Sequence, residues 1–242
     1  IPYSSPQKNG SGILTAAFAV GGETPPGAMV NTSVKYDGTS WTATNNINSA
    51  RGDVMAAGTL TAGLIMGGYQ NTPDFLFEET EEFNGTSWSE VNDMPTGAYS
   101  GSGTGTQTAA LVSHGTPHPN TVSEEYNGTS WTAGGTVGTA RYNVGAGGTS
   151  AGAVAFGGYP PSTYNAASED YDGSSWTAGN SLLNKRGLYN GGDGANTNYV
   201  YATGGDASGA PLGSDTNAVE IYNGTNWATA PNLTNGRRSG AS

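Results

Sequence analysis

The feature that most constrains this chain is a short aromatic segment that occurs five times. Each copy runs from an aromatic residue through Asn or Asp, Gly, Thr or Ser, and Ser or Asn to Trp. The five copies are spaced by 47, 43, 45 and 51 residues, and they end at Trp41, Trp88, Trp131, Trp176 and Trp227. A period of roughly 20–50 residues is typical of solenoids and propellers. We therefore expect a series of similar units rather than one irregular core.

A glycine doublet after a short apolar run gives each unit a second landmark. The doublets begin at Gly21, Gly67, Gly157 and Gly204, and His114-Gly115 takes this place in the third unit. From each Trp to the next doublet the count is 26, 26, 26 and 28 residues, whereas from each doublet to its own Trp it is 20, 21, 17, 19 and 23. The nearly constant interval predicts packed strands, and the variable one predicts surface loops.

Each unit is expected to contain four short strands. The Asn-Gly or Asp-Gly step before Trp indicates a hairpin of type I′ between the third and fourth strands, because that turn needs φ > 0 at both central residues. The second strand is the apolar run before the doublet, at 13–20, 60–66, 151–156 and 199–203. The first strand begins near an arginine ten residues after a Trp, and these are Arg51, Arg141, Arg186 and Arg237. The unit that starts near Ala98 lacks this arginine.

Four strands in each of five units is the length signature of an all-β, five-bladed β-propeller. The doublet followed by Tyr and Trp resembles the kelch repeat over nearly the whole chain. The Asn/Asp-Gly-Thr/Ser-Ser-Trp-Thr segments look most like the highly repetitive kelch-like proteins of marine phages and environmental bacteria. Tachylectin-like lectins are similar in having five blades of this length, although their motif is not found here. The resemblance implies a propeller, and the phage-like proteins imply a part displayed on a virion or an extracellular assembly.

We expect one domain over residues 1–242. The blades are expected at 11–45 with a closing strand at 237–242, and at 46–92, 93–135, 136–180 and 181–231. A ring needs its first and last blades to meet, so the termini are expected to share the first blade. We favour 237–242 as its innermost strand, with 1–10 as an added edge or linker. In the alternative, residues 1–10 supply that strand.

The repeated aromatic residues and glycines are given a structural interpretation. Five tryptophans at one register favour packing between blades over a ligand-stacking set. The aromatic residues that open the segments are interpreted alike, since Phe83 replaces the tyrosine of the others, Tyr36, Tyr126, Tyr171 and Tyr222. Turn geometry explains the segment glycines, Gly38, Gly85, Gly128, Gly173 and Gly224. It also explains the Asn residues of the Asn-Gly-Thr sequons, because Asp fills the same position in two units.

Carboxylates recur just before the segment aromatic residue. One set lies two residues before it, at Glu81, Glu124, Glu169 and Glu220, with Val34 in the first unit. The adjacent set is Glu82, Glu125 and Asp170. We expect one set to face solvent and the other to pair with the recurring arginines, because an Arg–carboxylate fork satisfies both groups inside a blade. An acidic ring that binds cations is the alternative.

The sequence offers no metal or catalytic constellation. The two histidines, His114 and His118, lie in a proline-containing loop that does not promise a fixed metal geometry. We interpret this loop as exposed, with one histidine in place of a glycine. The Asp-containing glycine segments lack the pattern of a calcium loop. Without cysteine, the copper site of galactose oxidase, the kelch-type enzyme, is excluded, and no Gly-x-Ser-x-Gly elbow supports a hydrolase. We therefore expect no cofactor and no enzymatic activity.

Charge and hydropathy limit the partners. The net charge is −11 with only 8 Lys and Arg, which disfavours nucleic acid because backbone binding needs clustered cations. No apolar run approaches the roughly 20 residues of a membrane helix, so we expect no membrane insertion. The first residue is Ile rather than Met, so we expect a processed product or part of a larger polypeptide or assembly, extracellular or virion-associated.

Function in a repeat scaffold is expected where the repeats differ. The variable loops between the second and third strands gather on one rim, at 23–31, 69–77, 116–121, 159–166 and 206–217. Prolines and aromatic residues there suit recognition, and the candidate binding residues are Tyr69, Phe75, His118, Tyr159 and Tyr164. We expect a recognition or structural propeller that contacts protein or glycan through this rim. A lectin with five equivalent sugar sites is the alternative, and a glycoside hydrolase with an asymmetric acidic pair is the third hypothesis.

Overall fold

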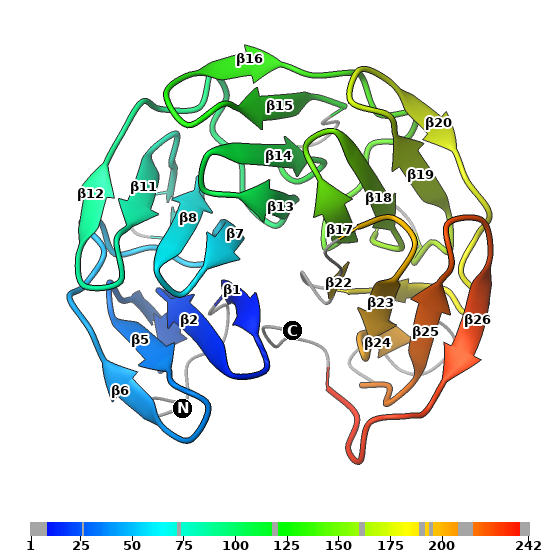
Figure 1. The fold of residues 1–242 in the computed structure, drawn as a ribbon, viewed down its shortest axis with the longest axis horizontal. Helices are drawn as coiled ribbons and strands as arrows, with labels where there is room; N and C mark the ends of the chain where they lie inside the picture. The colour runs from blue at the N-terminus through cyan, green and yellow to red at the C-terminus, as the bar shows by residue number, and fades with distance from the viewer. Residues whose placement is uncertain are drawn as a thin grey trace.

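Each repeat folds into one antiparallel sheet of four strands, and the five sheets stand around a common centre (Figure 1). The structure is a computed structural model that describes residues 9–25, 27–71, 74–117, 121–159, 163–188, 192–193, 196–207 and 215–237. These residues form strands and no helix, so no helix among them is long and apolar enough to cross a membrane. The expected all-β, five-bladed propeller is confirmed.

The strands of each blade follow one another from the centre to the outside in chain order. Blade 1 is β1 (Asn9–Ile13), β2 (Ala16–Val20), β5 (Ser33–Tyr36) and β6 (Trp41–Ala43). Blade 2 is β7 (Met55–Thr59), β8 (Ala62–Met66), β11 (Thr80–Phe83) and β12 (Trp88–Glu90). Blade 3 is β13 (Ser102–Thr106), β14 (Ala109–Ser113), β15 (Ser123–Tyr126) and β16 (Trp131–Ala133).

The last two blades repeat the pattern. Blade 4 is β17 (Gly145–Thr149), β18 (Gly152–Phe156), β19 (Ser168–Tyr171) and β20 (Trp176–Ala178). Blade 5 is β22 (Gly192–Asp193), β23 (Val200–Thr203), β25 (Val219–Tyr222) and β26 (Trp227–Ala230). Three two-stranded sheets lie in the loops: β3 (Glu23–Thr24) with β4 (Ala28–Met29), β9 (Tyr69–Asn71) with β10 (Asp74–Leu76), and β21 (Arg186–Gly187) with β24 (Asp206–Ala207).

The innermost strand of blade 1 differs from the expectation. We favoured residues 237–242, but β1 pairs with β2 from Asn9 opposite Val20 to Ile13 opposite Ala16. The N-terminal part of the chain therefore supplies this strand. Arg237 lies outside the strands, and residues 238–242 lie outside the described part of the chain. The backbone of Arg237 still occupies the arginine position of the repeat, since the N–H of Gly205 donates to the Arg237 carbonyl as the N–H of Gly22 donates to that of Arg51.

The turn between the third and fourth strands also differs from the expectation. A type I′ turn needs two residues with φ > 0, but among the described segment residues only the glycines have it, with φ of 95, 91, 86, 91 and 90°. The Asn or Asp side chain closes the turn instead. In blade 1, Oδ1 of Asp37 accepts from the backbone N–H groups of Thr39 and Ser40, both at 2.9 Å. These hydrogen bonds explain why Asn and Asp exchange freely at this position.

The core is divided into clusters that lie between neighbouring blades. Phe18 of blade 1 packs with Phe83 and Trp88 of blade 2, and Val154 of blade 4 packs with Trp227 of blade 5. Corresponding clusters join blades 2 and 3 and blades 3 and 4. Small residues along the inner strands let the sheets approach. The segment tryptophans of blades 2 to 5 thus lie at the contacts between neighbouring blades.

Replacing a turn glycine is expected to destabilise the protein. Gly128 has φ of 86°, and a Cβ there would lie 3.2 Å from Thr108, so Gly128→Val should cost about 1–2 kcal/mol of unfolding free energy. The matched control is Gly152→Ala, because Gly152 has an ordinary φ and its nearest contact would be 3.8 Å away. Urea denaturation measures both. Equal midpoints for the two variants would contradict this account of the turn.

Candidate functional site

Short backbone pairings at one end of the ring bring the variable loops together. The residue after each arginine position pairs with the residue after the glycine doublet, as Gly52 with Tyr69, Tyr99 with Thr116, and Tyr142 with Tyr159. In blade 5, the pair is Gly187 with Asp206. The backbone geometry repeats from blade to blade, but the side chains do not. This end of the ring is therefore where an asymmetric site is built on a symmetric scaffold.

Five half-buried tyrosines gather at these pairings, and we call them the tyrosine rim: Tyr69, Tyr99, Tyr142, Tyr159 and Tyr164. The rings of Tyr69 and Tyr99 stack across two blades with centroids 4.9 Å apart. Tyr159 lies 5.2 Å from both Tyr142 and Tyr164, measured between ring centroids. Part of each side chain stays accessible, so the rim offers aromatic surface to a ligand.

The rim also reaches into blade 5 through a polar contact. The hydroxyl of Tyr164 donates to Oδ2 of Asp206 at 2.5 Å, and Asp206 is 2% exposed. This contact joins the loop of blade 4 to the short strand β24. The rim therefore draws its tyrosines from blades 2 to 4 and contacts blade 5 through Asp206.

Beside the rim, the residues that lead into the innermost strands form a backbone chain around the centre, here called the inner collar: Asp53, Ser100, Asn143 and Leu188. Ser100 N–H donates to the Asp53 carbonyl, Asn143 N–H to that of Ser100, and Leu188 N–H to that of Asn143. Asp53, Ser100 and Asn143 have φ of 50, 53 and 53°. Non-glycine residues held with φ > 0 cost energy and gather at functional sites.

Asp53 is the titratable member of the inner collar. Burial, with the charge of Glu23, raises its pKa to about 6, although the hydroxyl of Ser100 donates to it at 3.2 Å. The collar thus combines a carboxyl group with a hydroxyl and an amide at equivalent positions. Such a set can donate and accept hydrogen bonds with a polar ligand.

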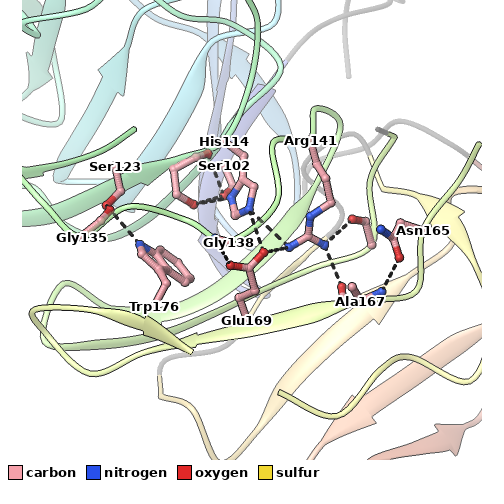
Figure 2. Close-up of polar contacts among 12 residues, drawn as sticks. Ser102, His114, Ser123, Gly135, Gly138, Arg141, Asn165, Ala167, Glu169 and Trp176 are labelled. Carbon is pink, nitrogen blue, oxygen red and sulfur yellow. Dashed lines mark hydrogen bonds and ion pairs between the residues drawn. The ribbon is translucent and has the colours of Figure 1, made fainter. Parts of the chain in front are cut away.

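Buried arginines hold the loops that carry the rim. Arg51, Arg141 and Arg186 are 0% exposed, and they form ion pairs with Glu81, Glu169 and Glu220 at 2.7, 2.7 and 3.0 Å. In blade 4, Nη1 of Arg141 also donates to the carbonyls of Gly157 and Ala167, both at 2.8 Å (Figure 2). Since Tyr142 follows Arg141 directly, this network fixes the backbone of the rim.

His114 joins this network from the neighbouring blade. It occupies the first position of a glycine doublet, with φ of 64°, and Figure 2 shows its ring beside Arg141 and Glu169. Burial lowers its pKa to about 4, so the ring is neutral at pH 7. Nε2 then accepts from Nη2 of Arg141 at 3.3 Å, and Nδ1 donates to the hydroxyl of Ser113 at 2.9 Å. The sequence interpretation of an exposed loop histidine is wrong for His114.

Glu169 remains ionised at the centre of this network. Burial alone would raise its pKa, but the contact with His114, the N–H of Gly138 and the charge of Arg141 together lower it to about 2. Oε2 accepts from Gly138 N–H at 2.6 Å, and Oε1 accepts from Arg141. The carboxylate is therefore committed to structure.

Blade 3 keeps the glutamate but lacks the arginine. Glu124 is 3% exposed, and its Oε2 has no hydrogen-bond partner among the described residues. Burial raises its pKa, the charge of Glu78 adds to this, and a hydrogen bond from Thr96 opposes it. A cavity of about 10 Å³ lies beside Glu124, Ala98 and His114, close to the space that one water needs. The cavity is lined both by Glu124 and by Ala98, which stands at the arginine position of the repeat.

We expected the second set of carboxylates to face solvent, but these groups form hydrogen bonds between blades. Glu82, Glu125 and Asp170 accept hydrogen bonds from tyrosine hydroxyls of the next blade, which belong to Tyr126, Tyr171 and Tyr222. Burial and these carboxylates raise the pKa of each of the three tyrosines. The segment tyrosines therefore contribute a polar link between blades as well as apolar area.

The binding residues predicted from the sequence do not all lie together in the structure. Tyr159 and Tyr164 lie together, whereas Tyr69 pairs with Tyr99. Phe75 is 50% exposed and pairs with Gln70 in the β9–β10 hairpin, so it faces away from Tyr69. His118 lies outside the described residues. Sequence reasoning missed Tyr99 and Tyr142; their place directly after the arginine position, where the units differ, was the available signal.

Comparison with known proteins identifies the fold and nothing finer. No family model and no curated protein matches the chain. Among solved structures, that of YjhT is similar, with a TM-score of 0.79 at 14% sequence identity, over 99% of this chain and 87% of that one. At this identity the likeness shows a shared propeller fold only.

Replacing His114 by glycine should remove a pH dependence of stability. The folded pKa of about 4 lies below the unfolded value of about 6.5, so the unfolded chain binds the additional proton between these values. The unfolding free energy should therefore fall as the pH drops from about 6.5 towards 4. Urea denaturation at pH 5 and pH 7 should show a smaller difference for His114→Gly. The control His118→Gly changes the other histidine, and an equal loss in both variants would refute the assignment.

Restoring the arginine of blade 3 should stabilise the protein. Because burial raises the pKa of Glu124, its ionisation opposes folding as the pH rises above the unfolded value of about 4.3. Ala98→Arg should raise Tm at pH 7 and reduce this decline, since the guanidinium can pair with Glu124 as Arg141 does with Glu169. Adding Glu124→Gln should abolish the gain. A lower Tm for Ala98→Arg at every pH would show that blade 3 cannot accommodate the side chain.

Proposed function

We propose that this chain is a non-enzymatic recognition module that binds one ligand on the tyrosine rim. The observation that carries the proposal is the gathering of Tyr69, Tyr99, Tyr142, Tyr159 and Tyr164 at one end of the ring. Tyrosine supplies large contact area with little conformational entropy to lose. The buried Arg–Glu pairs beneath hold the loops in place, so the ligand meets a surface that is already ordered.

The charges favour a neutral ligand. Three of the eight Lys and Arg are fully buried in ion pairs, whereas Asp53 and Glu23 lie close to the rim. A neutral glycan suits this chemistry, because its C–H faces stack on tyrosine rings and its hydroxyls bond to carboxylates and amides. The neutral polar surface of a protein is the other class. The resemblance to phage kelch-like proteins and the net acidity support an extracellular or virion-associated location.

A single site is favoured over five equivalent ones. The residue after the glycine doublet is Glu23, Tyr69, Thr116, Tyr159 or Asp206 in the five blades, so the rim positions are not repeated. The repeated Trp residues of blades 2, 3 and 5 are 6–9% exposed and are engaged in blade contacts. These differences support a stoichiometry near one rather than the five expected of the lectin alternative.

A hydrolase is the second candidate, and it depends on Asp53. Its raised pKa of about 6 is the kind found for a general acid, and Glu23 is the nearby carboxylate. The repeated acids of the third strands are occupied by arginine or tyrosine, except Glu124, which accepts a hydrogen bond from Thr96. Hydrolysis of chromogenic glycosides that is lost in Asp53→Asn would establish this alternative and refute the non-enzymatic proposal.

Removal of a rim tyrosine should weaken ligand binding. A glycan array followed by calorimetry should identify a neutral glycan with stoichiometry near one, and Tyr159→Ala should raise its Kd by about 3–10-fold, as expected from a lost aromatic contact. Tyr199→Ala is the matched control. Tyr199 is 64% exposed and lies directly before β23, whereas the loop at the tyrosine-rim end of the ring follows the other end of this strand. Stoichiometry near five, or equal effects of both variants, would contradict the proposal. If no neutral glycan binds, the ligand belongs to the other class, the neutral polar surface of a protein, and the same two variants test its binding.

A further inference from the structure

The junction between blade 5 and blade 1 differs from the four junctions between the other neighbouring blades. The inner strands of successive blades contact one another from β1 through β7, β13 and β17 to β22, and Figure 1 shows the ribbon of blade 5 set apart from that of blade 1. Tyr201 is 41% exposed, although the residues at the same register in blades 1 to 4 are at most 1% exposed: Phe18, Leu64, Leu111 and Val154. The side of blade 5 that faces the next blade is therefore accessible.

Other registers repeat this difference. Leu233 is half-buried and Arg237 is exposed. Their counterparts are buried, namely Ile47, Met94, Val137 and Leu182 for the leucine and Arg51, Arg141 and Arg186 for the arginine. On blade 1, Tyr36 is half-buried while its counterparts are at most 3% exposed: Phe83, Tyr126, Tyr171 and Tyr222. Both facing sides thus lack the cover that the other blades give one another.

The regular junctions share a set of hydrogen bonds between neighbouring blades, which we call the polar code. A segment tyrosine donates to an acid of the preceding blade, as Tyr126 does to Glu82 at 3.0 Å. In the junction of blades 1 and 2 both members are absent, since Lys35 stands at the acid position and Phe83 at the tyrosine position. A segment tyrosine therefore occurs where the preceding blade offers an acid, and phenylalanine occurs where it offers none.

Three tryptophan indoles follow a similar rule, whereas Nε1 of Trp227, between blades 4 and 5, has no hydrogen-bond partner among the described residues. Trp88, Trp131 and Trp176 donate to hydroxyls of Ser33, Thr80 and Ser123 in the preceding blade, at 3.0, 3.2 and 3.1 Å. Each hydroxyl is the first residue of the third strand. The same strand therefore offers one hydroxyl, one carboxylate for arginine and one carboxylate for tyrosine.

Direct contact of blade 5 with blade 1 would break every part of this code. Tyr36 would meet Ile221 in place of an acid, and Trp41 would meet Val219 in place of a hydroxyl. Arg237 would meet Val34 in place of its glutamate. At present Tyr36 donates to the carbonyl of Gly38 in its own turn, and Arg237 forms no ion pair with a described carboxylate. Burying polar groups without partners is costly, so direct closure is disfavoured.

We propose that the facing sides of blades 5 and 1 form a docking surface for one further four-stranded unit of this repeat. The occupant has phenylalanine at the tyrosine position, where it meets Ile221. It has an acid and a hydroxyl for Tyr36 and Trp41, and a glutamate for Arg237. Residues 52–97 of this chain have this combination, in Phe83, Glu82, Thr80 and Glu81, although their Trp88 would meet Val219 in place of a hydroxyl. A second copy docking its blade 1 on blade 5 would repeat the mismatches of direct closure.

The first test measures whether the two blades touch in solution. Thr42 and Ala228 directly follow the outer tryptophans of blades 1 and 5, and Thr132 and Thr177 are their exposed counterparts in blades 3 and 4. The chain has no cysteine, so spin labels can be placed in pairs. We expect a longer distance for 42/228 than for the control pair 132/177. Equal distances would mean direct closure and would overturn the proposal.

The second test supplies the occupant. In a chain of residues 1–237 followed by a second copy of 52–97, the 42/228 distance should match that of 132/228, two blades apart. Tm should rise by at least about 4 °C relative to the 242-residue chain. The control carries Thr80→Val, Glu81→Val and Glu82→Ile in the added copy only, and should lose most of the gain. An added copy digested by protease as fast as an unstructured tail, or an equal gain in the control, would overturn the proposal.

Discussion

The rest of the structure depends on a buried ion pair between an arginine that precedes the first strand and a glutamate in the third strand of the same blade. Arg51, Arg141 and Arg186 are fully buried, and removing one partner of such a pair typically costs about 3–5 kcal/mol. Each guanidinium also donates to a backbone carbonyl of its blade: that of Gly157 for Arg141, that of Ala202 for Arg186 and that of Glu79 for Arg51. One side chain thus joins three parts of a blade, and it fixes the loop that carries the candidate ligand surface.

Repetition makes the exceptions informative. Blade 3 lacks the arginine, and its Glu124 lies beside a small cavity. His114 replaces a doublet glycine in the same blade and reaches the ion pair of blade 4. Two departures from the repeat therefore lie close together. The protein tolerates the histidine because a neutral ring avoids the cost of an unpaired buried charge, and at Glu124 burial raises the pKa of the carboxyl group.

Much of the fold could be predicted from local signals. The glycine doublets and the Asn/Asp-Gly steps fix strand ends, so the second strands were expected within a few residues of their observed bounds. The turn type was predicted wrongly, since φ > 0 is confined to glycine when an Asn or Asp side chain supplies the hydrogen bonds. The innermost strand of blade 1 was assigned to the wrong terminus, because no arginine precedes Asn9–Ile13, whereas Arg237 stands ten residues after Trp227.

By itself, the sequence determined that five units of four strands surround a centre, because turn residues and apolar runs act over a few neighbouring positions. It also determined that the loops after the doublets would differ. Only the tertiary structure decided that Tyr142 meets Tyr159, that Tyr171 binds Glu125 of another blade, and that Arg237 and Tyr201 stay exposed. These outcomes depend on contacts between residues some 15–50 or more positions apart in the chain. The local pattern of a repeat is the same at every junction, whereas the fit of two blades depends on both of their surfaces.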